Sequence, residues 1–217
     1  MKKLISAVAM MLAGTQFLAA QPENDPEAKK ILDAVSAKYR SYDIIKADFS
    51  YTYNSPSENM ADTREGTLYV KPEENKYRIE IAGQEIISDG TTSWIYIKEV
   101  NEVQVSRASG NPEELNPSQI FTIHEKGYKY RMKGEGQVDG KPVYLIDLVP
   151  LKTSQYSKIE VAVDKNASFV RQLKVFDKSG DHYIYKVTGL TPNPDLKSGF
   201  FAFNKASYPG VEVVDLR

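Results

Sequence analysis

Residues 66–106 read GTLYVKPEENKYRIEIAGQEIISDGTTSWIYIKEVNEVQVS, and their alternation of apolar and polar residues indicates the type of structure. Within it, residues 76–82 alternate between apolar and charged side chains. Tyr77, Ile79 and Ile81 share one face, whereas Arg78 and Glu80 share the other. A period of two is typical of a β-strand with one dry face and one solvated face. The stretch therefore predicts a sheet with an apolar interior.

Turn signals separate this strand from many others of the same design. Asp89-Gly90 is a pair that favours a two-residue hairpin turn, so we expect the flanking strands to pair antiparallel. Alternating segments, divided by further turn signals such as Asp139-Gly140, continue to the C-terminus. About eleven strands at hairpin spacing predict a mainly β protein, built as a sandwich or a barrel.

Two segments have the pattern of helices instead. Asp25 and Pro26 are typical of a helix cap and first turn, and apolar residues follow at helical spacing: Ala28, Ile31, Leu32, Val35 and Tyr39. In the middle of the chain, residues 116–119 read NPSQ, which combines an N-cap, a first-turn proline and a capping-box glutamine. Ile120 and Phe121 follow directly. We expect both helices to cover what the sheet leaves open.

The first twenty residues have the composition of an export signal. Lys2 and Lys3 precede a short apolar run from residue 4 to residue 13, and Leu18-Ala19-Ala20 resembles a cleavage site. We therefore expect a signal peptide over residues 1–20, cleaved near Ala20, and a single domain over residues 21–217. A retained membrane anchor is the alternative, although the apolar run is too short to span a bilayer.

Composition excludes several other classes of protein. The chain has 217 residues with 28 Lys and Arg against 29 Asp and Glu, so no basic field favours nucleic acid. The chain has no cysteine, so the exported domain depends on its core alone and cannot carry a thioether-linked lipid.

The residues also argue against catalysis. A cysteine nucleophile is impossible, and the two histidines, His124 and His182, lie on different predicted elements. The sequence contains neither a cluster with metal-ligand spacing nor a Gly-x-Ser-x-Gly elbow. We expect no enzyme activity, no metal and no cofactor. An enzyme acting on envelope lipid or glycan remains an alternative, because the many carboxylates allow a catalytic pair.

Several motifs, in their order along the chain, resemble the periplasmic outer-membrane lipoprotein carriers of the LolA type. They are Leu68-Tyr69-Val70-Lys71-Pro72, the Tyr-Arg-Ile-Glu run at 77–80, Ser88-Asp89-Gly90 with Trp94 and Tyr96, and the ending from Phe201 to Asp215. The resemblance covers roughly residues 47–217. It implies an unclosed antiparallel β-barrel with helices as a lid over an apolar cavity.

The resemblance also implies a function and partners. Such carriers take lipoproteins by their acyl anchors from an inner-membrane ABC transporter, cross the periplasm and deliver them to an outer-membrane lipoprotein acceptor. We expect a monomer in the periplasm with this role. A lipid- or lipoprotein-sensing binding module of the cell envelope is the alternative.

The strand and helix patterns give candidate site residues. We expect an acyl-chain-binding cavity lined by Phe49, Tyr51, Ile79, Ile81, Ile87, Trp94 and Tyr96. We expect lid residues on the two helices at Ile31, Leu32, Val35, Ile120 and Phe121. Face assignment by parity is sensitive to any bulge, because one extra residue inverts every later side chain.

Lys71 is the candidate latch for the lid. Members of the resembled family carry an arginine directly before the corresponding proline, and that arginine helps to hold the lid. Here Lys71 precedes Pro72, and lysine lacks the planar fork that bridges several carbonyls. Either Lys71 latches the lid more weakly, another residue does so, or Lys71 is an exposed charge at a strand end.

Overall fold

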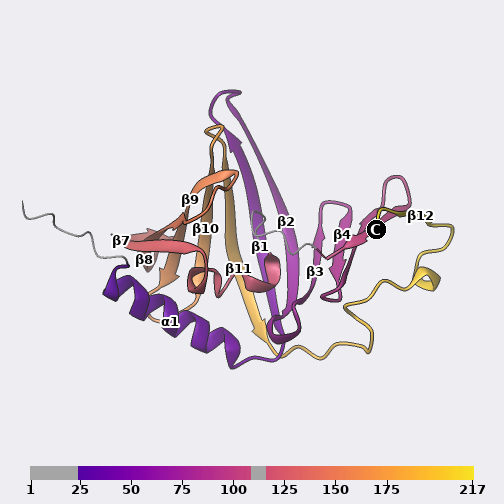
Figure 1. The fold of residues 1–217 in the computed structure, drawn as a ribbon, viewed down its shortest axis with the longest axis horizontal. Coiled ribbons are helices and arrows are strands. Elements are labelled where there is room, and N and C mark those ends of the chain that lie inside the picture. Colours follow the sequence, from indigo (N-terminus) through magenta and orange to yellow (C-terminus); the bar gives the residue numbers. More distant parts are fainter. Residues whose placement is uncertain (1–23, 109–115) are drawn as a thin grey trace, which may run out of the picture.

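The computed structural model describes residues 24–108 and 116–217. The predicted signal peptide lies outside these residues. One twisted sheet of twelve strands dominates the fold, with one long helix across it (Figure 1). The mainly β, unclosed architecture is therefore confirmed, with one strand more than expected.

The helix α1 runs over Pro26–Arg40. The strands are β1 (Ile45–Ser55), β2 (Met60–Lys71), β3 (Lys76–Ile81), β4 (Gln84–Ser88), β5 (Thr92–Ile97), β6 (Glu102–Arg107), β7 (Tyr128–Val138), β8 (Lys141–Pro150), β9 (Tyr156–Asp164), β10 (Val170–Asp177), β11 (His182–Pro192) and β12 (Glu212–Asp215). Short 3-10 turns occur at Pro72–Glu74, Pro117–Gln119, Ile123–Glu125 and Lys205–Ser207.

The strand order across the sheet is β12-β6-β5-β4-β3-β2-β1-β11-β10-β9-β8-β7. Neighbours pair antiparallel except at one end, where β12 lies parallel to β6. The sheet does not close on itself, because β12 and β7 are its two ends. Pairing of β1 with β11 joins the first strand to the second half of the chain, so all twelve strands form one continuous sheet.

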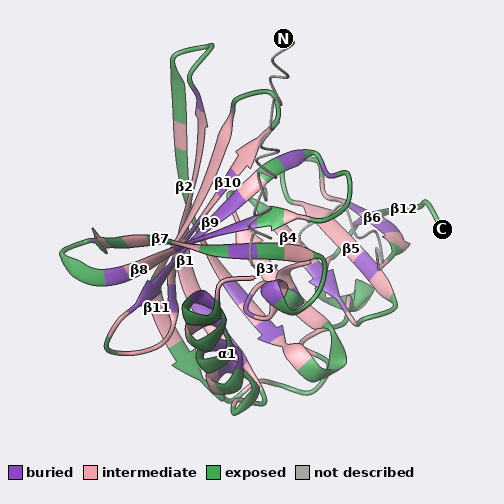
Figure 2. Cartoon of the chain, turned by 60° about the vertical axis from the view of Figure 1, so that its left-hand side comes forward, coloured by how far each residue is buried: buried purple, intermediate pink, exposed green. Residues whose placement is uncertain are grey.

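Local sequence explains where α1 begins. The Asp25 carboxylate accepts hydrogen bonds from the backbone N–H groups of Glu27 and Ala28, at 2.9 and 3.2 Å. Pro26 occupies the first turn, where a missing N–H costs nothing. The predicted apolar stripe faces the sheet, since Leu32, Val35 and Tyr39 are almost fully buried while the opposite side of α1 is exposed (Figure 2).

The predicted mid-chain helix is wrong. Residues 117–125 instead form two separate 3-10 turns. The predicted cap exists, because the Asn116 side chain accepts a hydrogen bond from Ser118 N at 2.9 Å. The turn is not extended into an α-helix, and Thr122 has a φ of −121°. A short helix has a costly nucleus, and contacts with α1 fix this segment in another form.

Candidate functional site

Cross-strand register divides the sheet into two faces. Directly opposed residues of antiparallel strands point to the same side, and one row comprises Ala47, Leu68, Ile79, Ile86 and Ile95. Ile45 and Val70 belong to the same side and pack with α1 in the main core cluster. We call this side the inner face, and the opposite side the outer face.

The seven residues expected to line one cavity divide between these faces. Phe49, Tyr51, Ile79 and Ile81 lie on the inner face. Ile87, Trp94 and Tyr96 lie on the outer face, in register with Arg78, Val105 and Val103. These three side chains therefore cannot face the same cavity as the other four. The C-terminal segment packs on this part of the outer face, where the ring of Tyr208 lies 4.6 Å from that of Tyr96.

Beyond α1, the inner face carries a half-buried apolar wall. We define this wall by the residues Phe49, Tyr51, Ile79, Ile81, Ile86, Ile95, Tyr183 and Tyr185, each of which keeps part of its surface exposed. The Tyr51 ring centroid lies 5.1 Å from that of Tyr185 and 6.3 Å from that of Tyr183. Tyr183 and Tyr185 were missed in the sequence, although the alternation of strand β11 marks both.

The tyrosines of the wall are neutral at physiological pH. Burial raises the pKa of Tyr185 to about 12, and burial also raises the pKa of Tyr51. Neutral rings with one hydroxyl each form a surface that suits hydrocarbon, and the one cation opposite Tyr51, Arg64, is paired with Asp62 at 2.8 Å. The wall is therefore suited chemically to an apolar ligand.

A glycine makes room for the wall at its centre. Gly66 lies directly opposite Phe49 in the register of β1 and β2. A Cβ atom at Gly66 would lie 2.8 Å from Phe49 Cζ and 2.8 Å from the backbone oxygen of Glu80. Both approaches are too close, so only glycine lets the Phe49 ring lie across β2.

Residues 116–127, which we call the lid segment, cover the border of the wall that lies next to α1. Phe121 is 6% exposed and stacks on Tyr39, with ring centroids 3.7 Å apart and planes 10° apart. Ile120 and, on α1, Ile31 pack against the core and are partly buried, whereas Leu32 and Val35 are almost fully buried. The structure thus brings all five predicted lid residues to the core cluster or its border.

Three polar residues of α1 tie this segment to the helix. Ser36 Oγ donates a buried hydrogen bond to the carbonyl oxygen of Phe121 at 3.2 Å. His124 Nε2 lies 3.3 Å from an oxygen of Asp33, and Arg40 pairs with Glu125 at 2.5 Å. Residues 33, 36 and 40 form one helical stripe beside the apolar one, a signal that the sequence offered.

Lys71, the predicted latch, has other partners. Its Nζ lies 2.7 Å from Glu74 and 3.5 Å from Asp43, and it lies on the outer side of β2. Both partners lie outside α1 and outside residues 116–127, so Lys71 ties the end of β2 to the α1–β1 connection. Residues 116–127 are contacted by α1 and also by Asn75, whose Oδ1 accepts hydrogen bonds from Ser118 Oγ at 3.5 Å and Gln119 Nε2 at 3.3 Å.

Two pockets flank the wall. One, of about 400 Å³, lies at the C-terminal end of α1 and is lined by Lys38, Tyr39, Tyr42, Ala167, Phe169, Arg171, Val187, Thr188, Gly189, Leu190 and Pro192. Val187 and Leu190 are inner-face residues in register with Phe49 and Ala47. This pocket therefore opens beside the wall, and Lys38 and Arg171 add charge to a lining that is otherwise largely apolar.

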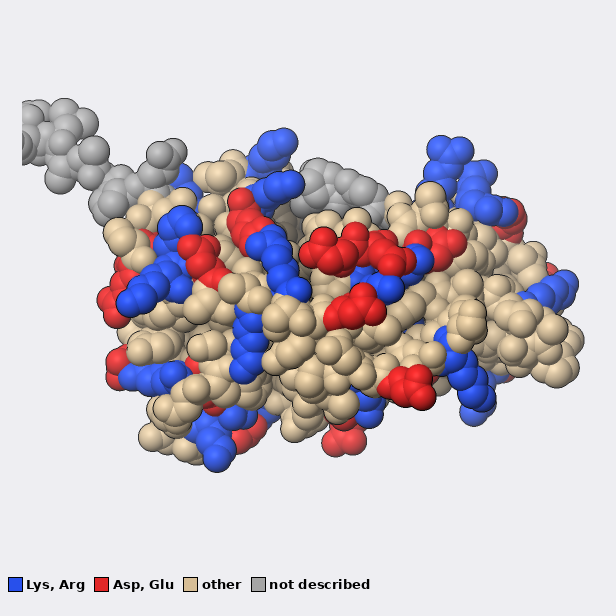
Figure 3. All heavy atoms as spheres, turned by 90° about the horizontal axis from the view of Figure 1, so that it is seen from below, with Lys and Arg blue, Asp and Glu red and all other residues tan. Residues whose placement is uncertain are grey.

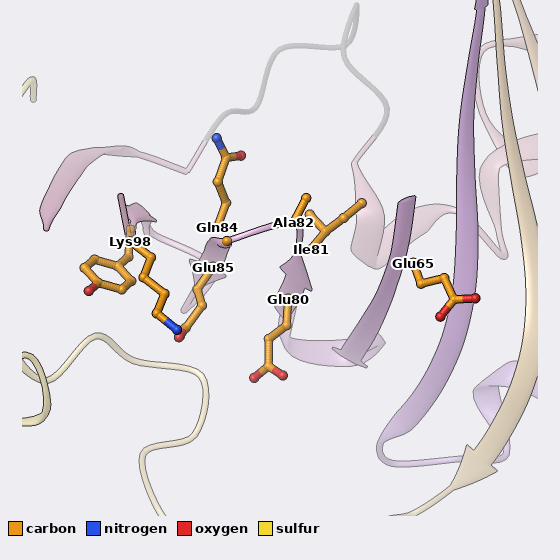
Figure 4. A pocket seen from close by; sticks show the side chains of 9 residues that line it. Glu65, Glu80, Ile81, Ala82, Gln84, Glu85 and Lys98 are labelled. Carbon is orange, nitrogen blue, oxygen red and sulfur yellow. The ribbon is translucent and has the colours of Figure 1, made fainter. Parts of the chain in front are cut away.

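The other pocket, of about 270 Å³, lies around the turn between β3 and β4 (Figure 4). Glu65, Glu80, Glu85 and Lys98 give it a polar lining, and Glu80 and Ile81 point to opposite sides of β3. Arg78 lies between the two paired carboxylates, 3.1 Å from Glu80 and in contact with Glu85. This arrangement neutralises surface charge and does not suit an acyl chain.

Two other kinds of site are absent from residues 24–108 and 116–217. These residues contain no group of three or more His, Cys, Asp or Glu that could hold a metal ion. None of the helices in this part of the chain is long and apolar enough to cross a membrane. His124 and His182 lie on separate elements, one beside α1 and one at the start of β11.

A family model described as "Outer membrane lipoprotein carrier protein LolA" matches residues 40–204, and the chain belongs to this family. The resemblance seen in the sequence is thus confirmed. A search of curated proteins gave no match.

Several solved structures are similar to this chain at low identity. An uncharacterised conserved protein from Thermus thermophilus is similar with a TM-score of 0.59 and 14% identity, over 87% of this chain and 99% of that one. A LolA superfamily protein from Nitrosomonas europaea has a TM-score of 0.46 and 14% identity, over 81% and 97% of the two chains. LprF from Mycobacterium bovis has a TM-score of 0.49 and 10% identity, over 80% and 97%.

The close approach at Gly66 gives a testable prediction. We expect Gly66→Ala to lower the free energy of unfolding by about 1–3 kcal/mol, because the added Cβ meets backbone that cannot move aside. Gly136→Ala is the matched control, since its Cβ would meet only the flexible side chain of Leu145 at 3.0 Å. Urea titration measures both, and equal effects would contradict the argument.

The lid segment gives a prediction on pH. Burial lowers the pKa of His124, so the unfolded chain takes up its proton more readily than the folded chain. Stability from this residue is therefore complete above about pH 6.5 and is lost as the pH falls further. We expect wild-type protein to lose more stability between neutral pH and about pH 5 than His124→Gln does.

His182 provides the control for this pH dependence. Burial also lowers the pKa of His182, so its titration persists in His124→Gln. Thermal unfolding at a series of pH values measures the difference. If wild type and His124→Gln have parallel curves, His124 does not couple the lid segment to pH.

Proposed function

We propose that this protein carries the acyl anchors of lipoproteins through the periplasm, from an inner-membrane ABC transporter to an outer-membrane acceptor. Membership of the LolA family supports this role. The apolar wall is the observation that carries the proposal, because it leaves half-buried aromatic and aliphatic side chains beside the lid segment, residues 116–127, which we also call the cover.

The physical need for a carrier is simple. Each acyl CH₂ exposed to water costs about 0.8 kcal/mol, so a lipid anchor cannot cross an aqueous space unshielded. The wall offers apolar surface without covalent chemistry. Binding there lowers the cost of transfer, and weak attachment of the cover allows release.

Loading requires residues 116–127 to move away from α1. Phe121 would then leave Tyr39, and the wall would become continuous with the pocket at the C-terminal end of α1. The chain can shelter an acyl anchor along this continuous apolar surface. Lining residues on the inner face, and not Ile87, Trp94 or Tyr96, then contact the cargo.

The wall can be tested with neighbouring substitutions on one strand. Tyr51→Glu places a charge on the inner face, and we expect affinity for a fluorescent acyl probe to fall about tenfold or more, because apolar contact is lost and a charge is desolvated. Thr52→Glu is the matched control. Its side chain lies on the outer face, where Thr52 Oγ1 lies 2.9 Å from Thr63 Oγ1.

Probe fluorescence and displacement by a diacylated peptide measure this binding. Equal weakening by both substitutions, or no binding to wild type, would contradict an acyl site on the wall. Binding of the peptide without transfer to acceptor-bearing vesicles would instead favour a sensing module.

The cover can be tested through its buried hydrogen bond. We expect Ser36→Ala to lower stability by about 1–2 kcal/mol, because the Phe121 carbonyl loses its donor. We also expect acyl-probe uptake to become faster, since the segment separates from α1 more easily. Stopped-flow fluorescence measures the uptake rate.

Ser41→Ala is the control for this experiment. Ser41 Oγ donates to the Lys38 carbonyl at 2.6 Å, so its loss weakens the end of α1 without touching residues 116–127. We expect no change in uptake rate for Ser41→Ala. An unchanged rate for Ser36→Ala would show that opening of this segment does not limit loading.

A further inference from the structure

The outer face of the strands β7–β10 carries a cluster of cationic side chains. We call it the basic face and define it by Lys129, Arg131, Lys133, Lys158 and Lys174. One cross-strand row runs from Arg131 through Asp147 and Glu160 to Lys174, so these residues share the outer side. The inner side of the same strands packs in the main core cluster beneath α1.

The carboxylates of the basic face are buried, whereas its most exposed charge is a cation. Its two carboxylates are buried, with Asp147 7% and Glu160 9% exposed. Lys158 lies 3.3 Å from Asp147, and Lys133 pairs with Glu160. The side chain of Arg131 is 78% exposed and lies 3.9 Å from Asp147. What this face presents to the surroundings is therefore positive.

This sign differs from the rest of the molecule. The chain as a whole has a net charge of −1, and acidic residues outnumber basic ones between residues 41 and 107. Seen from below, Lys and Arg are interspersed with Asp and Glu (Figure 3). The excess of positive charge over β7–β10 is thus a local feature.

Exposed apolar groups lie within the same surface. Val149 is 46% exposed and lies opposite Lys129, and Leu151 is 57% exposed just beyond it. The Phe176 ring lies under two cations, 4.6 Å from Lys158 Nζ and 5.0 Å from Lys174 Nζ. Cations around exposed aliphatic side chains are typical of surfaces that bind anionic lipid headgroups.

Protection of a sheet edge does not account for this surface. β7 is an end of the sheet, and lysines on an edge strand discourage pairing with other chains. However, Lys158 and Lys174 lie on the interior strands β9 and β10. Exposed Val149 and Leu151 would favour association rather than prevent it, so the surface fits a partner.

We propose that the basic face docks this protein on anionic phospholipid at a membrane surface. The proposal rests on the proposed function, because a carrier of acyl anchors loads and unloads at membranes. Docking through the outer face of β7–β10 leaves α1 and residues 116–127 free to separate. Cations spread over β7, β9 and β10 match a lipid surface better than a single acidic peptide.

Vesicle co-sedimentation tests the docking. We expect the protein to bind vesicles of phosphatidylglycerol and phosphatidylcholine more tightly than vesicles of phosphatidylcholine alone, and added salt to weaken this binding. The double variant Lys129→Gln/Arg131→Gln should bind about 25-fold more weakly, since each cation near such a surface contributes about fivefold. Lys197→Gln/Lys205→Gln is the charge-matched control, with two exposed lysines of the C-terminal segment.

A second variant guards against a folding defect. Val149→Ser/Leu151→Ser keeps every charge, and we expect it to weaken vesicle binding while its salt dependence is unchanged. Equal binding to both kinds of vesicle would overturn the proposal, as would equal loss in the basic-face and control variants. Binding only to an acidic protein would also overturn it.

Measuring acyl-probe binding on the same proteins separates the docking proposal from the proposed carrier function. The acyl probe is measured on wild type and on Lys129→Gln/Arg131→Gln, whose changes lie on the outer face. Normal probe binding with no preference for anionic vesicles would overturn docking alone. A preference for anionic vesicles with no probe binding would support docking and overturn the carrier role.

Discussion

One helix is too short to cover the inner face of this sheet. α1 has 15 residues and is therefore about 22 Å long, because an α-helix rises about 1.5 Å per residue. Twelve strands at a spacing of about 4.8 Å extend over roughly 50 Å before curvature is counted. The half-buried wall follows from this mismatch. Where α1 covers the sheet, Leu32, Val35 and Tyr39 are buried against it. Where α1 does not reach, the inner face remains half-buried and forms the wall.

The cover beside α1 is weakly held in comparison with the cargo it would admit. A net hydrogen bond contributes about 1 kcal/mol, an exposed ion pair such as Arg40–Glu125 about 0–1, and an aromatic stack about 0.5–1.5 beyond burial. Burial of Phe121 adds about 1.5–3 kcal/mol. One acyl chain of sixteen carbons offers more than 10 kcal/mol at about 0.8 per CH₂. Cargo binding therefore outweighs the contacts that it must break.

The sequence predicted the alternating strands, α1 and the family, but one missed turn misplaced three site residues. Ala82-Gly83, with φ angles of 45° and 79°, forms the tight turn between β3 and β4. It aligns Ile81 with Gln84, so Ile86 takes the inner face and Ile87 the outer. Trp94 lies directly opposite Ile87 and therefore also takes the outer face, and Tyr96, two residues later on β5, takes the same face. The mid-chain helix failed for another reason, since tertiary contacts with α1 outweighed local helix signals.

Separate faces let one sheet serve two purposes without conflict. Along β7–β10, alternate residues either fill the core beneath α1 or form the basic face, and a substitution on one side leaves the other in place. Over β3–β6 the C-terminal segment covers the outer side, where Arg78 contacts the carbonyl and ring of Phe200. The outer side of β7–β10, by contrast, is open and positive. The docking that we propose there would turn α1 and residues 116–127 away from the lipid, so the membrane would not block their separation.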